Sequence, residues 1–223
     1  MTKPIFRNAI WDFDGTLFDT YPAISRAFQQ ALADFGASAP LPEIESLCLV
    51  EVSHCATVLA ARFGLEMDAF TGAFGRHYLA IPLAEQPPFP GVREVCERIA
   101  GGGGANAIVT HRNGETAARI LTQHGLRSLF VEVITRDDGY PRKPDPAAFL
   151  AVLRHQGLDP QETLAIGDRE IDILAGRAAG LTTCLYRGTQ ASIAADIAIS
   201  DFAELLAYLA SLDERQAAAD SHG

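Results

Sequence analysis

The chain has 223 residues, which suggests one ordinary domain with a smaller insertion rather than two full domains. Its composition, with 48% hydrophobic and 21% charged residues, is typical of a soluble globular protein. The net charge of −10 argues against a nucleic-acid partner, because nucleic acids attract basic surfaces. No stretch approaches the ~18 apolar residues of a membrane span, and charged residues interrupt the N-terminal segment before a signal core forms. We therefore expect a cytoplasmic monomer or homodimer without a membrane partner.

The sequence contains four cysteines, Cys48, Cys55, Cys96 and Cys184. They are far apart and form no CxxC pair, so we expect buried free thiols in a reducing compartment. Cys48, His54, Cys55 and His77 could in principle hold zinc. Their spacing fits no common zinc motif, and we do not favour such a site.

The first predicted element is a strand over 5–11, which runs into Asp12-Phe13-Asp14-Gly15-Thr16. Glycine and threonine there indicate a turn at the carboxyl end of the strand. The segment 21–83 predicts helices instead, because small and apolar residues recur at helical spacing. A proline-rich connector over 86–91 closes this helical segment.

Beyond residue 91, helices and strands alternate. We expect helices over 92–100, 113–124, 146–156, from 168 to about 179, and over 202–212, and strands over 107–109, 131–134, 163–166 and 182–186. The polar tail after 212 is expected to fray. The alternation predicts an α/β fold with a Rossmann-like parallel sheet and helices on both faces. The α/β core then comprises 1–18 and 88–223, and 19–87 form an all-helical cap. Helices inserted there are expected above the carboxyl ends of the strands, where such sheets bind ligands.

Four sequence features fall just after a predicted strand or at the start of a helix. They are Asp12-x-Asp14-Gly15-Thr16, Thr110, Lys143 within Arg142-Lys143-Pro144-Asp145-Pro146, and Gly167-Asp168-x-x-x-Asp172. The carboxyl ends of parallel strands meet at one edge of a sheet, so these side chains are expected to form one site.

This set of motifs resembles the haloacid dehalogenase superfamily, in particular its phosphatase branch with a helical cap after the first strand. The resemblance extends over about 5–212. The segments DFDGTLFD (12–19), RKPDP (142–146) and GDREID (167–172) are similar to those of phosphoglycolate phosphatases. The resemblance implies Mg²⁺-dependent hydrolysis of a small phosphorylated metabolite. The chain departs from many relatives at Thr110-His111-Arg112, where they carry Thr-Asn or Ser-Asn.

The residues support the same chemistry independently. Asp12 is the candidate nucleophile, because a carboxylate can form an acyl-phosphate. Asp14 is the candidate acid that protonates the leaving oxygen and later the base that deprotonates water.

The remaining residues are expected to bind metal and phosphate. Asp12, Asp168, Asp172 and the main-chain carbonyl of Asp14 are candidate ligands of Mg²⁺, a hard ion that prefers oxygen. Asp172 could instead orient Lys143. Phosphoryl oxygens are expected to meet the Thr110 hydroxyl, main-chain N–H groups and the Lys143 ammonium. His111 and Arg112 follow Thr110 in the sequence and are expected to reach substrate from the core side.

Sequence features weigh against two rival reactions. A haloacid dehalogenase would not need an acid/base residue where Asp14 stands. A phosphonatase would need a Schiff-base lysine in the cap, and no lysine lies between Lys3 and Lys143. A sugar phosphomutase of the same superfamily and a non-catalytic binding protein on this fold remain alternatives. The cap is expected to set specificity, with candidates Arg26, Glu51, His54, Arg76 and Tyr78.

Overall fold

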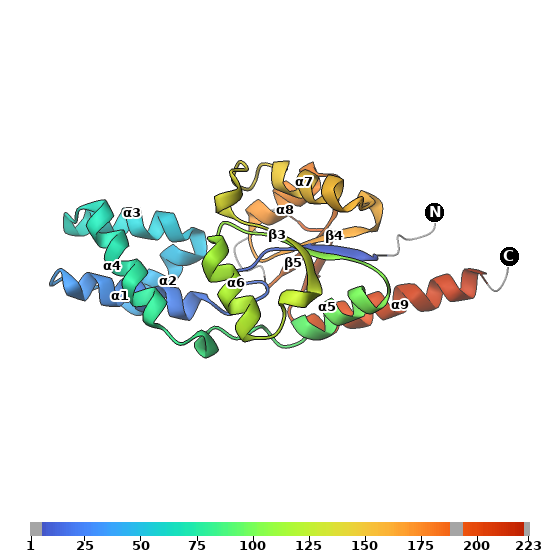
Figure 1. Cartoon of the computed structure of the whole chain (residues 1–223), viewed down its shortest axis with the longest axis horizontal. Coiled ribbons are helices and arrows are strands. Elements are labelled where there is room, and N and C mark those ends of the chain that lie inside the picture. The colour runs from blue at the N-terminus through green and yellow to red at the C-terminus, as the bar shows by residue number, and fades with distance from the viewer. Residues whose placement is uncertain (1–5, 188–193, 221–223) are drawn as a thin grey trace. The chain divides into compact units, whose positions relative to one another are not determined.

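The computed structural model describes the chain over 6–187 and 194–220 (Figure 1). The chain divides into two compact units. One comprises Met1–Phe18 with Pro88–Gly223, and the other comprises Asp19–Pro87. We refer to them as the core unit and the cap unit.

The core unit is built on a parallel sheet of six strands in the order β3-β2-β1-β4-β5-β6. The strands are β1 (Asn8–Trp11), β2 (Asn106–Val109), β3 (Phe130–Ile134), β4 (Thr163–Gly167), β5 (Thr182–Tyr186) and β6 (Ile197–Ile199). The α/β prediction is confirmed. The short edge strand β6 was not predicted, because three residues with one exposed and one buried side chain give too little periodic signal.

Five α-helices accompany the strands in the described core unit. They are α5 (Val92–Gly101), α6 (Gly114–Gln123), α7 (Ala147–Gln156), α8 (Glu170–Ala178) and α9 (Phe202–Asp220), with 3-10 turns η2 (Arg127–Leu129), η3 (Arg136–Asp138) and η4 (Pro160–Glu162). Figure 1 shows α7 and α8 on one side of the sheet and α5 and α9 on the other. The expectation that the chain frays after 212 was wrong, since α9 continues to Asp220.

Burial of apolar side chains on both faces fixes this sheet. On the first face, Ile10 and Ala165 pack with Phe149 of α7 in one buried cluster. On the second face, the Trp11 ring lies 5.7 Å from the ring of Phe202 on α9. Strands buried on both faces read as continuous apolar runs, which is why the sequence pattern predicted them well.

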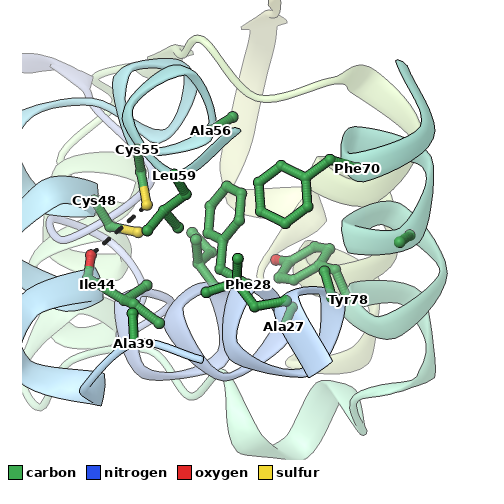
Figure 2. Packing of buried hydrophobic residues seen from close by; sticks show 14 of the residues in the cluster. Ala27, Phe28, Ala39, Ile44, Cys48, Cys55, Ala56, Leu59, Phe70 and Tyr78 are labelled. Carbon is green, nitrogen blue, oxygen red and sulfur yellow. Dashed lines mark hydrogen bonds between the residues drawn. The ribbon is translucent and has the colours of Figure 1, made fainter. Parts of the chain in front are cut away.

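The cap unit has its own hydrophobic core. Its helices are α1 (Tyr21–Asp34), α2 (Leu41–Val50), α3 (Val52–Phe63), α4 (Met67–Ala80) and the turn η1 (Leu83–Glu85). Figure 2 shows Phe28, Leu59 and Phe70 converging between these helices, and the rings of Phe28 and Phe70 are 5.9 Å apart. Such an independent core is what a separate compact unit requires.

The four cysteines are free and buried, as expected. Cys48 and Cys55 lie within the apolar cluster of the cap unit (Figure 2). His54 is exposed, and His77 Nε2 lies 2.9 Å from Asp34 Oδ2. Zinc is therefore not supported at these residues.

Candidate active site

The strand order places three predicted motifs at the carboxyl edge of neighbouring strands. The chain runs from β1 to β2 on one side of β1, whereas β4 lies on the other side. Asp12 follows β1, Thr110 follows β2 and Asp168 follows β4. Open α/β sheets bind ligands where the strand order reverses in this way.

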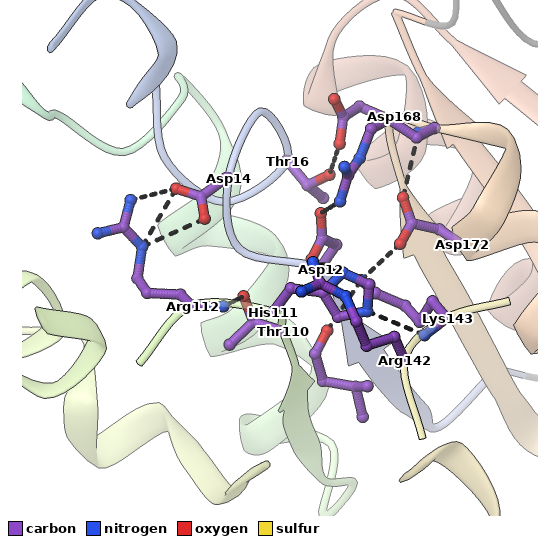
Figure 3. A network of polar contacts seen from close by, with 12 residues as sticks. Asp12, Asp14, Thr16, Thr110, His111, Arg112, Arg142, Lys143, Asp168 and Asp172 are labelled. Atoms are coloured by element: carbon purple, nitrogen blue, oxygen red, sulfur yellow. Dashed lines mark hydrogen bonds and ion pairs between the residues drawn. The ribbon is translucent and has the colours of Figure 1, made fainter. Parts of the chain in front are cut away.

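Lys143 joins two of the predicted carboxylates. It lies on the loop before α7, and its Nζ is 2.7 Å from Asp12 Oδ1 and 2.6 Å from Asp172 Oδ1 (Figure 3). The ammonium also donates to the main-chain carbonyl of Val109 at 3.1 Å. All three charged side chains are almost fully buried. Burial acts to lower the pKa of Lys143, but Asp12 and Asp172 outweigh it and raise that pKa, so the ammonium stays charged.

Asp168 completes an acidic group with Asp12 and Asp172. Single carboxylate oxygens of these three residues all lie within 4.8 Å of one another. Thr16 Oγ1 donates to Asp168 Oδ1 at 2.9 Å and so orients the carboxylate. Burial raises the pKa of Asp168, and the charges of Asp12 and Asp172 raise it further, to about 8. The three carboxylates therefore repel one another in the metal-free protein.

The acidic group suits a hard divalent cation. Oδ2 of Asp12 is buried and accepts no hydrogen bond from the described residues, and Arg169 Nη2 lies 3.8 Å from it. Burial and Asp172 raise the pKa of Asp12, against the effect of Lys143. A cation among these oxygens would relieve the repulsion and take up the unused lone pairs.

Thr110 forms a hydrogen bond within the loop that follows β2, and His111 connects this loop to the loop of Lys143. Thr110 Oγ1 accepts from the main-chain N–H of Arg112 at 3.1 Å. His111 Nε2 accepts from the main-chain N–H of Lys143 at 2.9 Å and thereby joins the two loops. Burial lowers the pKa of His111 to about 3, helped by the charges of Lys143 and Arg142, so the ring is neutral near pH 7. The structure shows His111 holding Lys143 in place, and direct contact of His111 with substrate stays a prediction.

Asp14 lies apart from the acidic group. Arg112 holds its carboxylate, with Nε 3.2 Å from each carboxylate oxygen and Nη2 also bonded to Oδ1 (Figure 3). The part of Asp14 in metal binding, through its main-chain carbonyl, stays a prediction.

Two glycines permit the local backbone at the site. Gly15 has a φ of 79°, a conformation that other residues adopt rarely, and this allows the tight turn after Asp14. At Gly167, a Cβ would overlap the side chain of Asp172. The glycine therefore lets the first turn of α8 approach the end of β4.

The motifs did not indicate a role for Thr16 or Arg169, although both residues lie within them. The pair of Arg112 with Asp14 was not predicted either. No sequence signal indicated that Arg112 would reach Asp14, because the two are separated by 98 positions.

Three of the five cap residues suggested for specificity make side-chain contacts within the cap unit. Arg26 pairs with Glu85 at 2.6 Å, and Arg76 Nη2 lies 3.7 Å from Asp34. The buried hydroxyl of Tyr78 donates to Gln86 Oε1. A role of these cap residues in substrate binding stays a prediction.

Comparison with known proteins identifies the class of the chain. The family model described as haloacid dehalogenase-like hydrolase matches residues 9–186. The chain therefore belongs to the haloacid dehalogenase-like hydrolase family, and the resemblance inferred from the motifs is confirmed.

Within this family, the chain is similar to proteins named phosphoglycolate phosphatase. The chain is 30% identical over 216 residues to the phosphoglycolate phosphatase of Yersinia pseudotuberculosis, covering 90% of this chain and 91% of that one. It is 32% identical to the phosphoglycolate phosphatase of Aliivibrio fischeri, covering 76% and 79%. The crystal structure of a predicted phosphoglycolate phosphatase from Haemophilus somnus has a TM-score of 0.78 and 25% identity, and covers 91% of this chain and 97% of that one. Within the described ranges, no helix combines the length and apolar character needed to cross a membrane.

Proposed function

We propose that this hydrolase is a Mg²⁺-dependent phosphatase that removes the phosphoryl group from a small phosphorylated metabolite through an aspartyl-phosphate at Asp12. The observation that carries the proposal is the group formed by the buried side chains of Asp12, Lys143 and Asp172 with the half-buried Asp168. It combines a carboxylate nucleophile, a fixed ammonium and a set of oxygen ligands. Phosphoryl transfer depends on this combination of positioning and charge neutralisation.

In the first step, an oxygen of Asp12 attacks phosphorus as the bond to the alcohol oxygen breaks. The proton for the departing alkoxide comes from the carboxyl group of Asp14. In the second step, Asp14 accepts a proton from water, the water oxygen attacks phosphorus and the bond to Asp12 breaks. Inorganic phosphate leaves, and both aspartates return to their starting states.

The other residues hold the reacting groups in place. Lys143 binds Asp12 and supplies positive charge for the phosphoryl oxygens, while Asp172 fixes the ammonium from the other side. The Thr110 hydroxyl is the second candidate contact for phosphate. Mg²⁺ held by Asp12, Asp168, Asp172 and the carbonyl of Asp14 would neutralise the negative charge of the phosphate.

The names of the relatives suggest where to look for the substrate. Phosphoglycolate is the first compound to test, because several relatives at about 30% identity carry that name. We propose a small soluble phosphomonoester as the partner, in a cytoplasmic setting.

The test is release of inorganic phosphate from phosphoglycolate and 4-nitrophenyl phosphate, before and after metal is removed. Activity should vanish with a chelator and return when Mg²⁺ is added. Asp168→Asn should require much more Mg²⁺ for half-maximal activity while retaining its circular dichroism spectrum. Full activity of the metal-stripped wild-type protein would contradict the metal assignment. Transfer of phosphate within a sugar phosphate, without net release, would instead favour the phosphomutase alternative.

A further inference from the structure

Arg169 directly follows Asp168 and stands at the start of α8, beside the acidic group of the site. Its side chain is only 16% exposed, and its Nη2 lies 3.8 Å from Oδ2 of Asp12. Its main-chain N–H donates to Oδ2 of Asp172 at 3.1 Å. The backbone of Arg169 is thus tied to one carboxylate of the group, while its guanidinium lies next to another.

The distance between Arg169 and Asp12 allows attraction of charges without a hydrogen bond. A separation of 3.8 Å is too long for an N–H···O bond, yet short for two opposite charges. Lys143 differs in this respect, because its Nζ donates to Oδ1 of the same carboxylate at 2.7 Å. Oδ2 is buried and accepts no hydrogen bond within the described part of the chain. The oxygen beside Arg169 is therefore one that still has lone pairs for a metal ion.

The charge of Arg169 acts on all three carboxylates of the acidic group. Burial acts to raise the pKa of Asp12, Asp168 and Asp172, and the positive charge of Arg169 acts to lower the pKa of each. Guanidinium groups stay charged in proteins. Arg169 is therefore a permanent cation that offsets part of the repulsion among these carboxylates in the metal-free protein.

A divalent cation in the acidic group would have to contend with this charge. If the guanidinium stays in place, it repels the metal ion. If it turns away, it gives up its attraction to the carboxylates. Both responses reduce the affinity for metal, so the presence of Arg169 stabilises the metal-free site and weakens the metal-bound one.

We propose that Arg169 is an internal counter-ion of the metal site, which competes with the divalent cation for the acidic group and so keeps the affinity for Mg²⁺ moderate. The proposal rests on the metal assignment within the proposed phosphatase function. It gives the removal of Arg169 two effects of opposite sign, lower stability without metal and tighter binding of Mg²⁺. An arginine that only held the loop in shape would give the reverse for metal, because its removal would disturb the ligands and weaken binding.

The experiment is calorimetric titration of metal-free protein with Mg²⁺, for wild type, Arg169→Gln, Arg169→Ser and Arg169→Lys. The first two variants should lower the Kd for Mg²⁺ by ~5–50-fold, whereas Arg169→Lys, which keeps the charge, should stay within about threefold of wild type. Arg169 occupies the N-cap position of α8, where serine is a favoured residue, so Arg169→Ser secures a folded variant without the charge.

Thermal unfolding in the presence of a chelator measures the second effect. The midpoint should fall by about 2–6 °C in Arg169→Gln, and saturating Mg²⁺ should reduce the difference from wild type. Arg154→Gln is the matched control for the loss of one positive charge. Arg154 is exposed on α7, where its Nε donates to the carbonyl of Leu150, and its replacement should leave the Kd for Mg²⁺ unchanged.

An unchanged or higher Kd in the two charge-free variants would overturn the proposal, as would a Kd in Arg169→Lys that falls as far as in Arg169→Gln. Release of phosphate from 4-nitrophenyl phosphate separates this inference from the proposed function. Tighter Mg²⁺ binding by Arg169→Gln without any turnover by wild type would refute the phosphatase function and retain the counter-ion. Mg²⁺-dependent turnover with an equal Kd in wild type and Arg169→Gln would refute the role of Arg169 alone. Absence of Mg²⁺ binding in wild type and in both charge-free variants would refute the metal assignment together with this inference.

Discussion

Lys143 stands out in a chain whose other basic residues are almost all arginines. The sequence has sixteen arginines and two lysines. The Lys143 ammonium fits between Asp12 and Asp172 and also reaches the carbonyl of Val109. A compact charge with three donors can bond in three directions, whereas a planar guanidinium bonds within one plane. The geometry therefore explains why this position requires lysine.

Asp168 gives the metal-free protein a testable pH dependence. Its folded-state pKa of about 8 lies above the ordinary value of 3.8, so the folded state binds this proton more tightly than the unfolded state. The resulting stabilisation is fully present below about pH 4 and is lost as the pH rises through about 8. The lowered pKa of Asp172 acts in the opposite sense, and its contribution is lost as the pH falls below the ordinary range of a carboxylate.

Thermal unfolding of metal-free protein between about pH 5 and pH 9 measures this effect. Wild type should lose more stability across the range than Asp168→Asn, whose side chain does not titrate. Added Mg²⁺ should restore the stability of wild type most strongly at the alkaline end. Parallel pH profiles of the two proteins would show that Asp168 is not the titrating group.

At the scale of elements, the sequence predicted the five long strands of the sheet to within a few residues. Apolar runs bounded by glycine and polar residues identify such strands well, and the first one begins at Asn8 rather than at residue 5. The edge strand β6 was not predicted because it is stabilised by pairing with β5 rather than by its own sequence. The last turns of α9 were not predicted because they continue the helix into a polar sequence. Local patterns thus define the centres of elements better than their ends.

The close contact between α8 and the sheet depends on Gly176, a glycine inside a helix, where helix propensity alone would favour another residue. A Cβ on Gly176 would overlap the side chain of Ala165 on β4. Gly176→Ala should therefore lower the free energy of unfolding by about 1–3 kcal/mol, despite the better helix propensity of alanine.

Denaturant unfolding of Gly176→Ala beside Gly101→Ala tests this expectation. Gly101 ends α5 in the same core unit, and a Cβ there meets no atom within 4 Å. Gly101→Ala should be neutral or slightly stabilising, by less than about 1 kcal/mol. Equal stability of the two variants would mean that the packing of α8 tolerates a methyl group.

At the scale of the whole molecule, the distribution of charge matters more for binding an anion than the net charge does. The chain carries a net charge of −10, yet Lys143 and Arg169 lie beside the acidic group of the site, and Arg112 pairs with Asp14. Charges beyond about 8 Å are largely screened at physiological salt, so the charges close to the site decide whether an anion can enter. An acidic protein can therefore act on an anionic substrate.

The order of motifs along the chain was sufficient to predict that the site residues converge. Parallel strands bring their carboxyl ends together, so Asp12, Thr110 and Asp168 could be placed at one edge without coordinates. The pairing of Arg112 with Asp14 could not be predicted in this way, because side-chain direction depends on packing around Phe13. That pairing is thus a part of the site that needed the structure.

The central claim is that Asp12 forms the covalent bond to phosphorus. Asp14→Asn with 4-nitrophenyl phosphate isolates this step, because nitrophenolate leaves without help from an acid. Hydrolysis of the aspartyl-phosphate would still lack its base, a contribution of typically ~10²–10⁴-fold. The phosphorylated enzyme should therefore accumulate after a burst of nitrophenolate.

Acid quenching followed by mass spectrometry of the peptide that contains Asp12 measures that accumulation directly. We predict a phosphoryl group on Asp12 in Asp14→Asn, and none in Asp12→Asn/Asp14→Asn treated in the same way. An unmodified Asp12 peptide during continued turnover, or a phosphoryl group on a different residue, would contradict the mechanism.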